Sequence, residues 1–340
     1  MSGETELSTM NQFAAAGTLA CRDVCVAISL LLSLGFLAAT QAVAAEVHTA
    51  VEVKPVAVEL GGTDQVLSRG YRCSATLDLR SQALSPQQEQ AICQELADIE
   101  ARFHRVFGTE GKPVKHDLNN SLRANIYASA DEFIRYAGAH FNMPTNNGGM
   151  YLEGLPEQTG NRAEFVANQN KDGSVRNLGH EYVHYLDGRF NLYGDFCANL
   201  HDSHEPPENC AKPAPQTPYL IWWTEGVAEY IARGADHPRA LKLAGSKVFS
   251  LSQLFDTGYM SNSGDERVYA WGYLAARFML EQQRPRLEQM LSFTRSGDYP
   301  RYQALLRGWG SSLDAEFAKW LESLNSAPTQ TQPHTQTALK

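Results

Sequence analysis

Several features that would place this 340-residue chain in other functional classes are missing from its sequence. The chain has no cluster of basic residues, no glycine-rich phosphate loop, no dinucleotide-binding glycine fingerprint and no internal repeat. Acidic residues outnumber basic ones 38 to 29, which gives a net charge of −9. A mildly acidic surface argues against nucleic acid or an anionic membrane as the partner.

Cysteine is also scarce, and no pair of cysteines has the C-x-x-C spacing that is typical of zinc-binding cysteines. Cys21 and Cys25 lie in an N-terminal segment that we interpret as a targeting signal. The other four cysteines suggest two disulfides in an exported chain, and their proximity along the sequence favours the pairs Cys73–Cys93 and Cys197–Cys210.

The N-terminal segment has the pattern of a secretory signal. A nearly unbroken apolar run from Val24 to Ala38 precedes the small residues of 42–45, so we expect a signal peptide over residues 1–45 and a secreted protein, extracellular or periplasmic. The long region before the run, with Arg22 as its only basic residue, leaves open a start at Met10 or retention as a membrane anchor. Removal of the signal leaves a net charge of −7 and no expected membrane contact.

The rest of the chain mixes strand and helix patterns, and 43% hydrophobic residues suffice for a substantial core. We therefore expect an α+β fold, with a lead-in and helix over 46–118, a main domain over 119–325 and a disordered tail over 326–340. The expected segments are an extended lead-in (46–70), a helix (85–107), a strand (122–128), a helix capped by Ser129, two pairing strands (150–153 and 163–167), helices over 174–190 and 219–232, and a helical remainder to about residue 324.

One motif carries the chemistry: His180-Glu181-Tyr182-Val183-His184, an H-E-x-x-H pattern. Positions i and i+4 lie on one face of a helix, so the two imidazoles can share a zinc ion. The glutamate between them can reach a metal-bound water and act as the general base. Apolar residues at Leu178, Val183 and Leu186 predict a half-buried helix, with Ser174 or Asp172 as its cap.

The third zinc ligand is open to three readings. A histidine six residues after the motif would be typical of metzincins, but that position is Phe190. His201 and His204 lie in a proline-rich insertion, where solvated histidines are the commoner case. Glu225 lies on a separate predicted helix with Gly226 behind it, which allows close approach. We take Glu225 as the ligand.

Further carboxylates and hydroxyls have candidate supporting roles. Glu229, one turn after Glu225, is placed to accept the outer N–H of a ligand histidine. The alternative is that Glu229 is a surface carboxylate. Asp187 could serve similarly or lie in solvent. The oxyanion of peptide hydrolysis would need one donor besides zinc, and Tyr269, Tyr230 and His237 are candidates that residue type alone cannot rank.

Together, the segments HEYVHYLDGRF, WWTEGVAEY and NNGGMYLEG resemble the peptidase domain of the microbial collagenases, a gluzincin family of zinc endopeptidases. The similarity runs from about Asn119 to Met279. It implies a thermolysin-like fold, with a small mixed sheet ending in an edge strand, an active-site helix, a glutamate helix and a helical C-terminal part. It also implies His180, His184 and Glu225 as zinc ligands and Glu181 as general base.

The resemblance extends to the substrate-binding side of the site. It implies that the stretch from Gly148 and Gly149 to Met150 and Tyr151 is the edge strand on which substrate lies as an added strand; from the residues alone, the two glycines could instead form a simple hairpin turn. Glu153 matches a calcium ligand of the family. Tyr269 matches its oxyanion-side tyrosine, although aromatic residues at helical spacing are more often core.

The sequence therefore predicts a secreted, monomeric zinc endopeptidase. The activator and collagen-binding modules of larger collagenases do not accompany its motifs, so gelatin or other unfolded protein is the easier substrate and native collagen the harder one. One alternative is a gluzincin aminopeptidase, but the glutamate of its G-x-M-E-N motif is replaced by Tyr151. The other is a non-catalytic matrix-binding module, which normally loses the base or a ligand.

Overall fold

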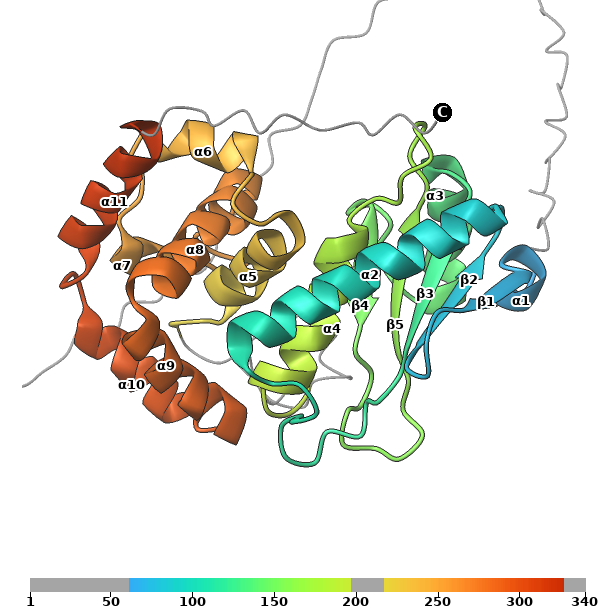
Figure 1. Cartoon of the computed structure of the whole chain (residues 1–340), viewed down its shortest axis with the longest axis horizontal. Coiled ribbons are helices and arrows are strands. Elements are labelled where there is room, and N and C mark those ends of the chain that lie inside the picture. The colour runs from blue at the N-terminus through green and yellow to red at the C-terminus, as the bar shows by residue number, and fades with distance from the viewer. Residues whose placement is uncertain (1–60, 197–216, 327–340) are drawn as a thin grey trace, which may run out of the picture. The chain divides into compact units, whose positions relative to one another are not determined.

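The computed structural model describes residues 61–196 and 217–326 (Figure 1). Five strands form one mixed sheet in the order β1-β2-β3-β5-β4. The central pairs β2/β3 and β3/β5 are parallel, whereas β1 and β4 pair antiparallel with their neighbours and form the two edges. The strands are β1 (Arg69–Arg72), β2 (Leu77–Ser81), β3 (Leu122–Tyr127), β4 (Gly149–Leu152) and β5 (Ala163–Asn168).

Helices cover both faces of this sheet because its central strands alternate their side chains. Ile126 and Phe165 face the main core, which α2 (Pro86–Phe107) and α4 (Leu178–Asn191) complete. Their neighbours Tyr127 and Val166 face a smaller core under α3 (Ala130–Phe141) and a short first helix, α1 (Thr63–Val66). Figure 1 shows α2 running across the strands.

The remaining elements are helical. α5 packs against both α4 and α8, so it joins the sheet half of the core to the helical half. A π-helical turn, η1, leads directly into α8. These elements are α5 (Ile221–Arg233), α6 (Pro238–Ala244), α7 (Leu251–Leu254), η1 (Glu266–Trp271), α8 (Gly272–Gln282), α9 (Arg284–Ser296), α10 (Tyr299–Trp309) and α11 (Asp314–Ser326).

Most predicted elements are present close to their predicted bounds. Ser85 and Ser129 cap α2 and α3 through their side chains, and β4 pairs with β5. A small mixed sheet with many helices is therefore confirmed. Among the described residues, no helix is both long and apolar enough to span a membrane.

Two predictions about local structure are wrong. The metal-binding helix does not begin near Ser174: α4 begins at Leu178, after Asn177 in the left-handed conformation (φ 54°), and the Ser174 hydroxyl bonds to Asp172 instead. The lead-in is not simply extended up to residue 70, because residues 63–66 are helical and β1 begins at Arg69.

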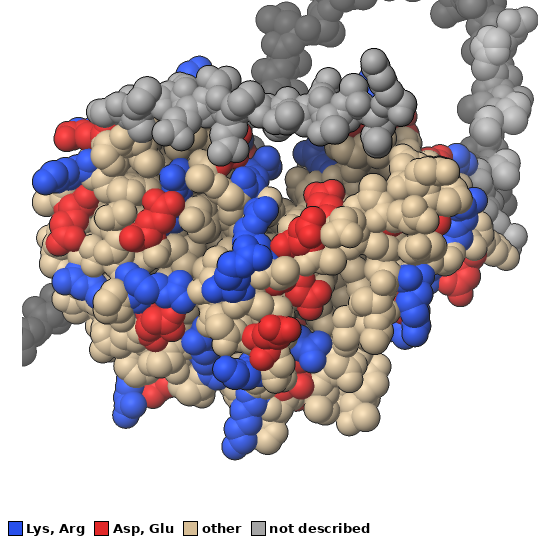
Figure 2. All heavy atoms as spheres, in the orientation of Figure 1, with Lys and Arg blue, Asp and Glu red and all other residues tan. Residues whose placement is uncertain are grey.

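One of the two predicted disulfides, Cys73–Cys93, is present, with a Cα–Cα distance of 5.2 Å. It joins the residue that follows β1 to the second turn of α2. The predicted pair Cys197–Cys210, the signal segment over 1–45 and the tail over 327–340 lie outside the described residues. Figure 2 shows acidic and basic side chains interspersed over one face of the molecule, with no basic patch gathered there.

Candidate metal and catalytic site

His180 and His184 lie one turn apart on α4, with their side chains on the face that meets α5. Their Nε2 atoms are 3.0 Å apart. His180 is buried and His184 nearly so. The helical spacing therefore brings two ring nitrogens to one point, as the motif predicts.

Glu225 reaches the same point from α5. Its Oε2 lies 3.1 Å from His180 Nε2 and 3.7 Å from His184 Nε2. This buried oxygen has no hydrogen-bond partner among the described residues. Ligand atoms of a tetrahedral zinc ion at about 2.0–2.1 Å lie roughly 3.3 Å from one another. The three side chains fit a His-His-Glu metal site.

Close helix packing makes this convergence feasible. A Cβ on Gly179 of α4 would lie 2.7 Å from Ile99 and 3.2 Å from Ala232 of α5. A Cβ on Gly226 would lie only 2.2 Å from the backbone oxygen of Gly272 in α8. Glycine at position 226 therefore lets α5 and α8 meet backbone to backbone beside the candidate ligand, a contact with α8 that the sequence did not predict.

Glu229 holds the outer side of His180. Its Oε1 lies 3.0 Å from His180 Nδ1, its Oε2 lies 3.1 Å from His237 Nε2, and Arg233 contacts the same oxygen. Burial alone would raise the pKa of Glu229, but His180, His237 and Arg233 hold it well below its usual range. Glu229 is therefore an ionised, buried carboxylate. A proton on His180 Nδ1 would leave Nε2 free to bind a metal.

Glu181 points toward the edge strand rather than toward the other carboxylates. Its Oε1 would lie 3.4 Å from a Cβ on Gly149, and the backbone N–H of Tyr151 donates to its carboxylate. Burial raises the pKa of Glu181, while the two neighbouring histidines oppose that rise. A buried carboxylate of raised pKa beside a metal site is well suited to take up and release a proton.

The predicted substrate-binding stretch forms the outer edge of the sheet. Gly149 and Tyr151 face α4, and the Tyr151 ring stacks on that of His184 at 6.4 Å. Gly148 has a positive φ of 77° and lies against Arg176. Met150 points to the other face of the sheet and packs with the α3 core, so its side chain does not line the site.

Of the three candidate oxyanion donors, one lies beside the imidazoles. The Tyr269 ring, in η1, is 5.9 Å from the His180 ring. Tyr230 donates instead to Glu281, and His237 contacts Glu229. Burial raises the pKa of Tyr269, so its hydroxyl is a donor at neutral pH.

The sequence of the chain is similar to those of known proteins. The sequence model of peptidase family M9, described as "Collagenase", matches residues 35–320. The chain belongs to this collagenase family. It is 42% identical over 270 residues to a "Microbial collagenase" of Vibrio alginolyticus. This match covers 77% of this chain and 31% of that protein.

Other relatives extend the comparison. The chain is 38% identical to a "Microbial collagenase" of Vibrio parahaemolyticus (80% of this chain, 32% of that protein) and 25% identical to "Collagenase ColT" of Clostridium tetani (65% and 21%). It thus spans about a third of the length of the Vibrio relatives. A solved "aminopeptidase N family protein" of Idiomarina loihiensis is 12% identical, and the match covers 76% of this chain and 44% of that chain. Its TM-score of 0.30 is too low to indicate a shared fold.

Two further carboxylates of this collagenase-family chain are buried. Glu153 packs against Gly188 of α4 and accepts the backbone N–H of Phe196 at 3.1 Å. Burial, followed by the charges of Asp195 and Asp117, raises the pKa of Glu153 well above its usual value. Asp187 is not in solvent: it accepts from Asn191 at 2.7 Å, and burial raises its pKa to about 6.

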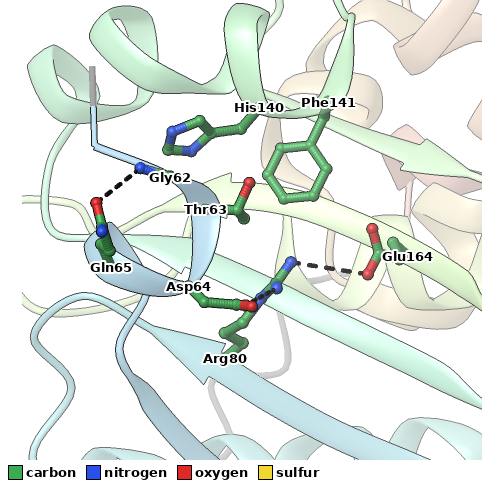
Figure 3. A pocket seen from close by; sticks show the side chains of 8 residues that line it. All are labelled: Gly62, Thr63, Asp64, Gln65, Arg80, His140, Phe141 and Glu164. Atoms are coloured by element: carbon green, nitrogen blue, oxygen red, sulfur yellow. Dashed lines mark hydrogen bonds and ion pairs between the residues drawn. The ribbon is translucent and has the colours of Figure 1, made fainter. Parts of the chain in front are cut away.

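A surface hollow of about 460 Å³ lies away from this site, between α1 and α3 (Figure 3). Arg80 lies at its floor and is paired with Asp64 and Glu164, so its charge is already compensated. None of the candidate metal ligands lines this hollow. The alternative ligands His201 and His204 lie outside the described residues.

Sequence reasoning missed one residue of the site entirely. The Tyr259 hydroxyl, on the loop between α7 and η1, donates to Glu225 Oε1. No spacing relates Tyr259 to either motif, because a loop carries it. The sequence predicts His237 only as a candidate oxyanion donor, whereas in the structure it contacts Glu229.

Proposed function

We propose that the chain is a zinc-dependent endopeptidase that cleaves extended segments of unfolded protein, with gelatin-like chains as its substrate class. The convergence of His180, His184 and Glu225 on one point carries this proposal. Membership of the collagenase family supports it. Zinc suits the donor set, because two imidazoles and one carboxylate leave a fourth coordination position open.

The surrounding residues then have distinct tasks. Zinc, when bound, polarises the scissile carbonyl and lowers the pKa of a water molecule. Glu181 takes the proton of the attacking water and gives it to the leaving amine. Glu229 fixes the tautomer of His180 through Nδ1. The hydroxyl of Tyr269 donates to the developing oxyanion.

The edge strand favours extended substrate. The outer side of β4 has no strand neighbour in the described sheet, so a peptide can add there as a further strand beside Glu181. Gly149, without a side chain, lets that peptide backbone approach the carboxylate. Recognition through the backbone suits internal cleavage of unfolded chains.

Three further parts of the proposal follow from the sequence and the resemblance. The segment over residues 1–45 directs export, and residues 119–325 form the peptidase domain. The mature chain acts as a monomer outside the cytoplasm. Glu153, a buried carboxylate of raised pKa near two other acidic residues, contributes to a calcium site, because a cation would relieve their mutual repulsion.

A digestion of gelatin and native fibrillar collagen side by side tests the function, with Glu181→Gln as the blank and the products sequenced by mass spectrometry. We expect internal cuts in gelatin by the parent chain and none by Glu181→Gln, which should still bind zinc stoichiometrically because Glu181 is outside the ligand set. Release of single N-terminal residues alone would indicate an aminopeptidase. Bound zinc without cleavage of either protein would indicate a binding module.

A further inference from the structure

The two carboxylate oxygens of Glu225 have different neighbours, because Tyr259 contacts only one of them. Its hydroxyl donates to Oε1, whereas Oε2 faces His180 and His184 and accepts no hydrogen bond among the described residues. A carboxylate held in this way can rotate little about its last torsion. One oxygen alone is therefore presented to the point where the imidazoles meet.

The loop that carries Tyr259 is tied to η1. Arg267 of η1 donates through Nε to Thr257 Oγ1 at 3.1 Å, and it also donates to the backbone oxygen of Gln253. Within the loop, Gly258 N–H donates to Ser261 O at 3.2 Å. The η1 turn thus fixes the position of Tyr259 as well as carrying Tyr269, so both tyrosines are placed by one element.

The chemistry of the two groups suits this contact. A phenol is an ordinary hydrogen-bond donor, and a carboxylate is an acceptor. The hydrogen bond from the Tyr259 hydroxyl to Glu225 Oε1 is therefore of the charge-assisted kind, which is stronger than one between neutral groups.

We propose that Tyr259 is a positioning residue that orients Glu225 as a one-oxygen metal ligand. This inference rests on the proposed zinc site. Without the hydroxyl, Oε1 becomes a buried acceptor without this partner, and the carboxylate is free to turn toward His184 or to offer both oxygens to the metal. The metal site is then less preorganised, although every ligand is still present.

The test compares Tyr259→Phe with Tyr269→Phe, which removes a hydroxyl from the same site but not from Glu225. Zinc affinity of the metal-free proteins is measured by competition with a chelator. We expect Tyr259→Phe to bind zinc about 10- to 100-fold more weakly, as is usual when a partner of a metal ligand is lost. Tyr269→Phe should stay within about twofold of the parent chain, because it does not touch a ligand carboxylate.

Two further readouts separate positioning from a general structural effect. The visible spectrum of the cobalt-substituted protein should change in Tyr259→Phe and not in Tyr269→Phe, since the coordination of Glu225 changes only in the first. In a Glu225→Ala background, Tyr259→Phe should cause no further loss of zinc affinity, because the tyrosine acts through the carboxylate that is gone.

Equal zinc affinity and an unchanged cobalt spectrum in Tyr259→Phe would overturn the inference, and so would an additive loss in the Glu225→Ala background. If the parent chain bound no zinc, the proposed function itself would fail, which is a different result. Circular dichroism checks that Tyr259→Phe is folded. If it is not, 3-fluorotyrosine at position 259 of the otherwise unchanged chain should give a fluorine resonance that shifts on zinc addition, and a constant resonance would refute the contact.

Discussion

Replacing Gly226 by alanine tests the helix crossing on which the site depends. The new Cβ would lie 2.2 Å from the backbone oxygen of Gly272 and 2.9 Å from the Cβ of Ala276. Real Cβ atoms essentially never come closer than 3.0 Å to another heavy atom, so α5 and α8 must separate by about 0.8 Å or more. The obstructing atom belongs to the backbone and cannot rotate away.

The expected cost follows from two opposing effects. Alanine in place of glycine in a helix contributes about 1 kcal/mol of stability. Overpacking a well-packed core costs about 1–3 kcal/mol, and a rigid backbone contact places this case near the upper end. We therefore expect Gly226→Ala to lower the free energy of unfolding by about 2 kcal/mol, which corresponds to a fall in Tm of roughly 3–4 °C for a chain of this size.

The chain offers two matched controls for the same substitution. A Cβ on Gly272, on the opposite side of the crossing, would have its nearest neighbours at 3.4 Å, and one on Gly308 of α10 would meet nothing within 4 Å. Gly272→Ala should stay within about 1 kcal/mol of the parent, and Gly308→Ala should be neutral or stabilising by up to about 1 kcal/mol.

Urea unfolding followed by circular dichroism measures all three variants, and peptide cleavage measures the consequence for catalysis. Separation of α5 from α8 moves Tyr269 relative to Glu225, and a misplacement of about 1 Å can cost on the order of a hundredfold in rate. If Gly226→Ala unfolds like the parent chain, or if Gly272→Ala costs as much as Gly226→Ala, the reasoning about this crossing is wrong.

Two other predictions concern metal ions. Glu225→Ala should weaken zinc binding more than Glu229→Ala, for which we expect a loss of about 10- to 100-fold in a chelator competition; the reverse order would mean that ligand and supporting carboxylate are exchanged. Calcium should raise the Tm of the parent chain and not that of Glu153→Gln, because the variant lacks the proposed ligand. In calcium-free buffer the variant should be at least as stable as the parent, since burial penalises the charged carboxylate; equal calcium shifts in both would contradict the site.

The elements predicted best from sequence are those whose signals are local. The Ser85 hydroxyl caps α2, and the Ser85 N–H donates in return to Gln88 Oε1. The helix buries Ile92, Leu96, Ile99 and Phe103, and its bounds agree with the prediction. α5 likewise ends at Gly234, as predicted. α2 has its N-terminal cap and its buried face within its own sequence, whereas the last carbonyls of α5, those of Ile231 and Ala232, accept from Arg102 of α2.

The start of α4 could not be predicted in the same way, because a turn closed by backbone pairing over six to eight residues decides it. Gln169, just after β5, forms a bridge with Val175, and Arg176 N–H donates to Asn168 O. These bonds keep residues 169–176 in a tight turn, so the capping signals of Ser174 and Asp172 are used within that turn. A locally paired turn has replaced the helix start that these side chains would otherwise cap.

The edge strand β1 was missed for a related reason. None of its four residues is buried, so it carries no alternating apolar pattern. Its support comes from backbone pairing with β2, from the adjacent Cys73–Cys93 disulfide and from the ion pairs of its two arginines with Asp78 and Glu89. The position of a strand without a buried face is set by pairing with its neighbouring strand, and that pairing cannot be predicted from the residues of the strand itself.

The η1 turn explains why the roles of the tyrosines could not be ranked from sequence. Residues 266–271 have helical spacing and aromatic content that fit an ordinary core helix, yet the N–H of Gly272 bonds back to Arg267 O, five residues earlier. A π-turn is rare and is frequently found at functional sites. Here the wider turn lies between the tightly packed Gly272 and Arg267, which anchors the Tyr259 loop. The extra residue of the π-turn therefore lets α8 keep its close contact with α5 while the Tyr269 ring lies beside that of His180. Residue spacing alone does not reveal this balance between helix packing and the placement of a site residue.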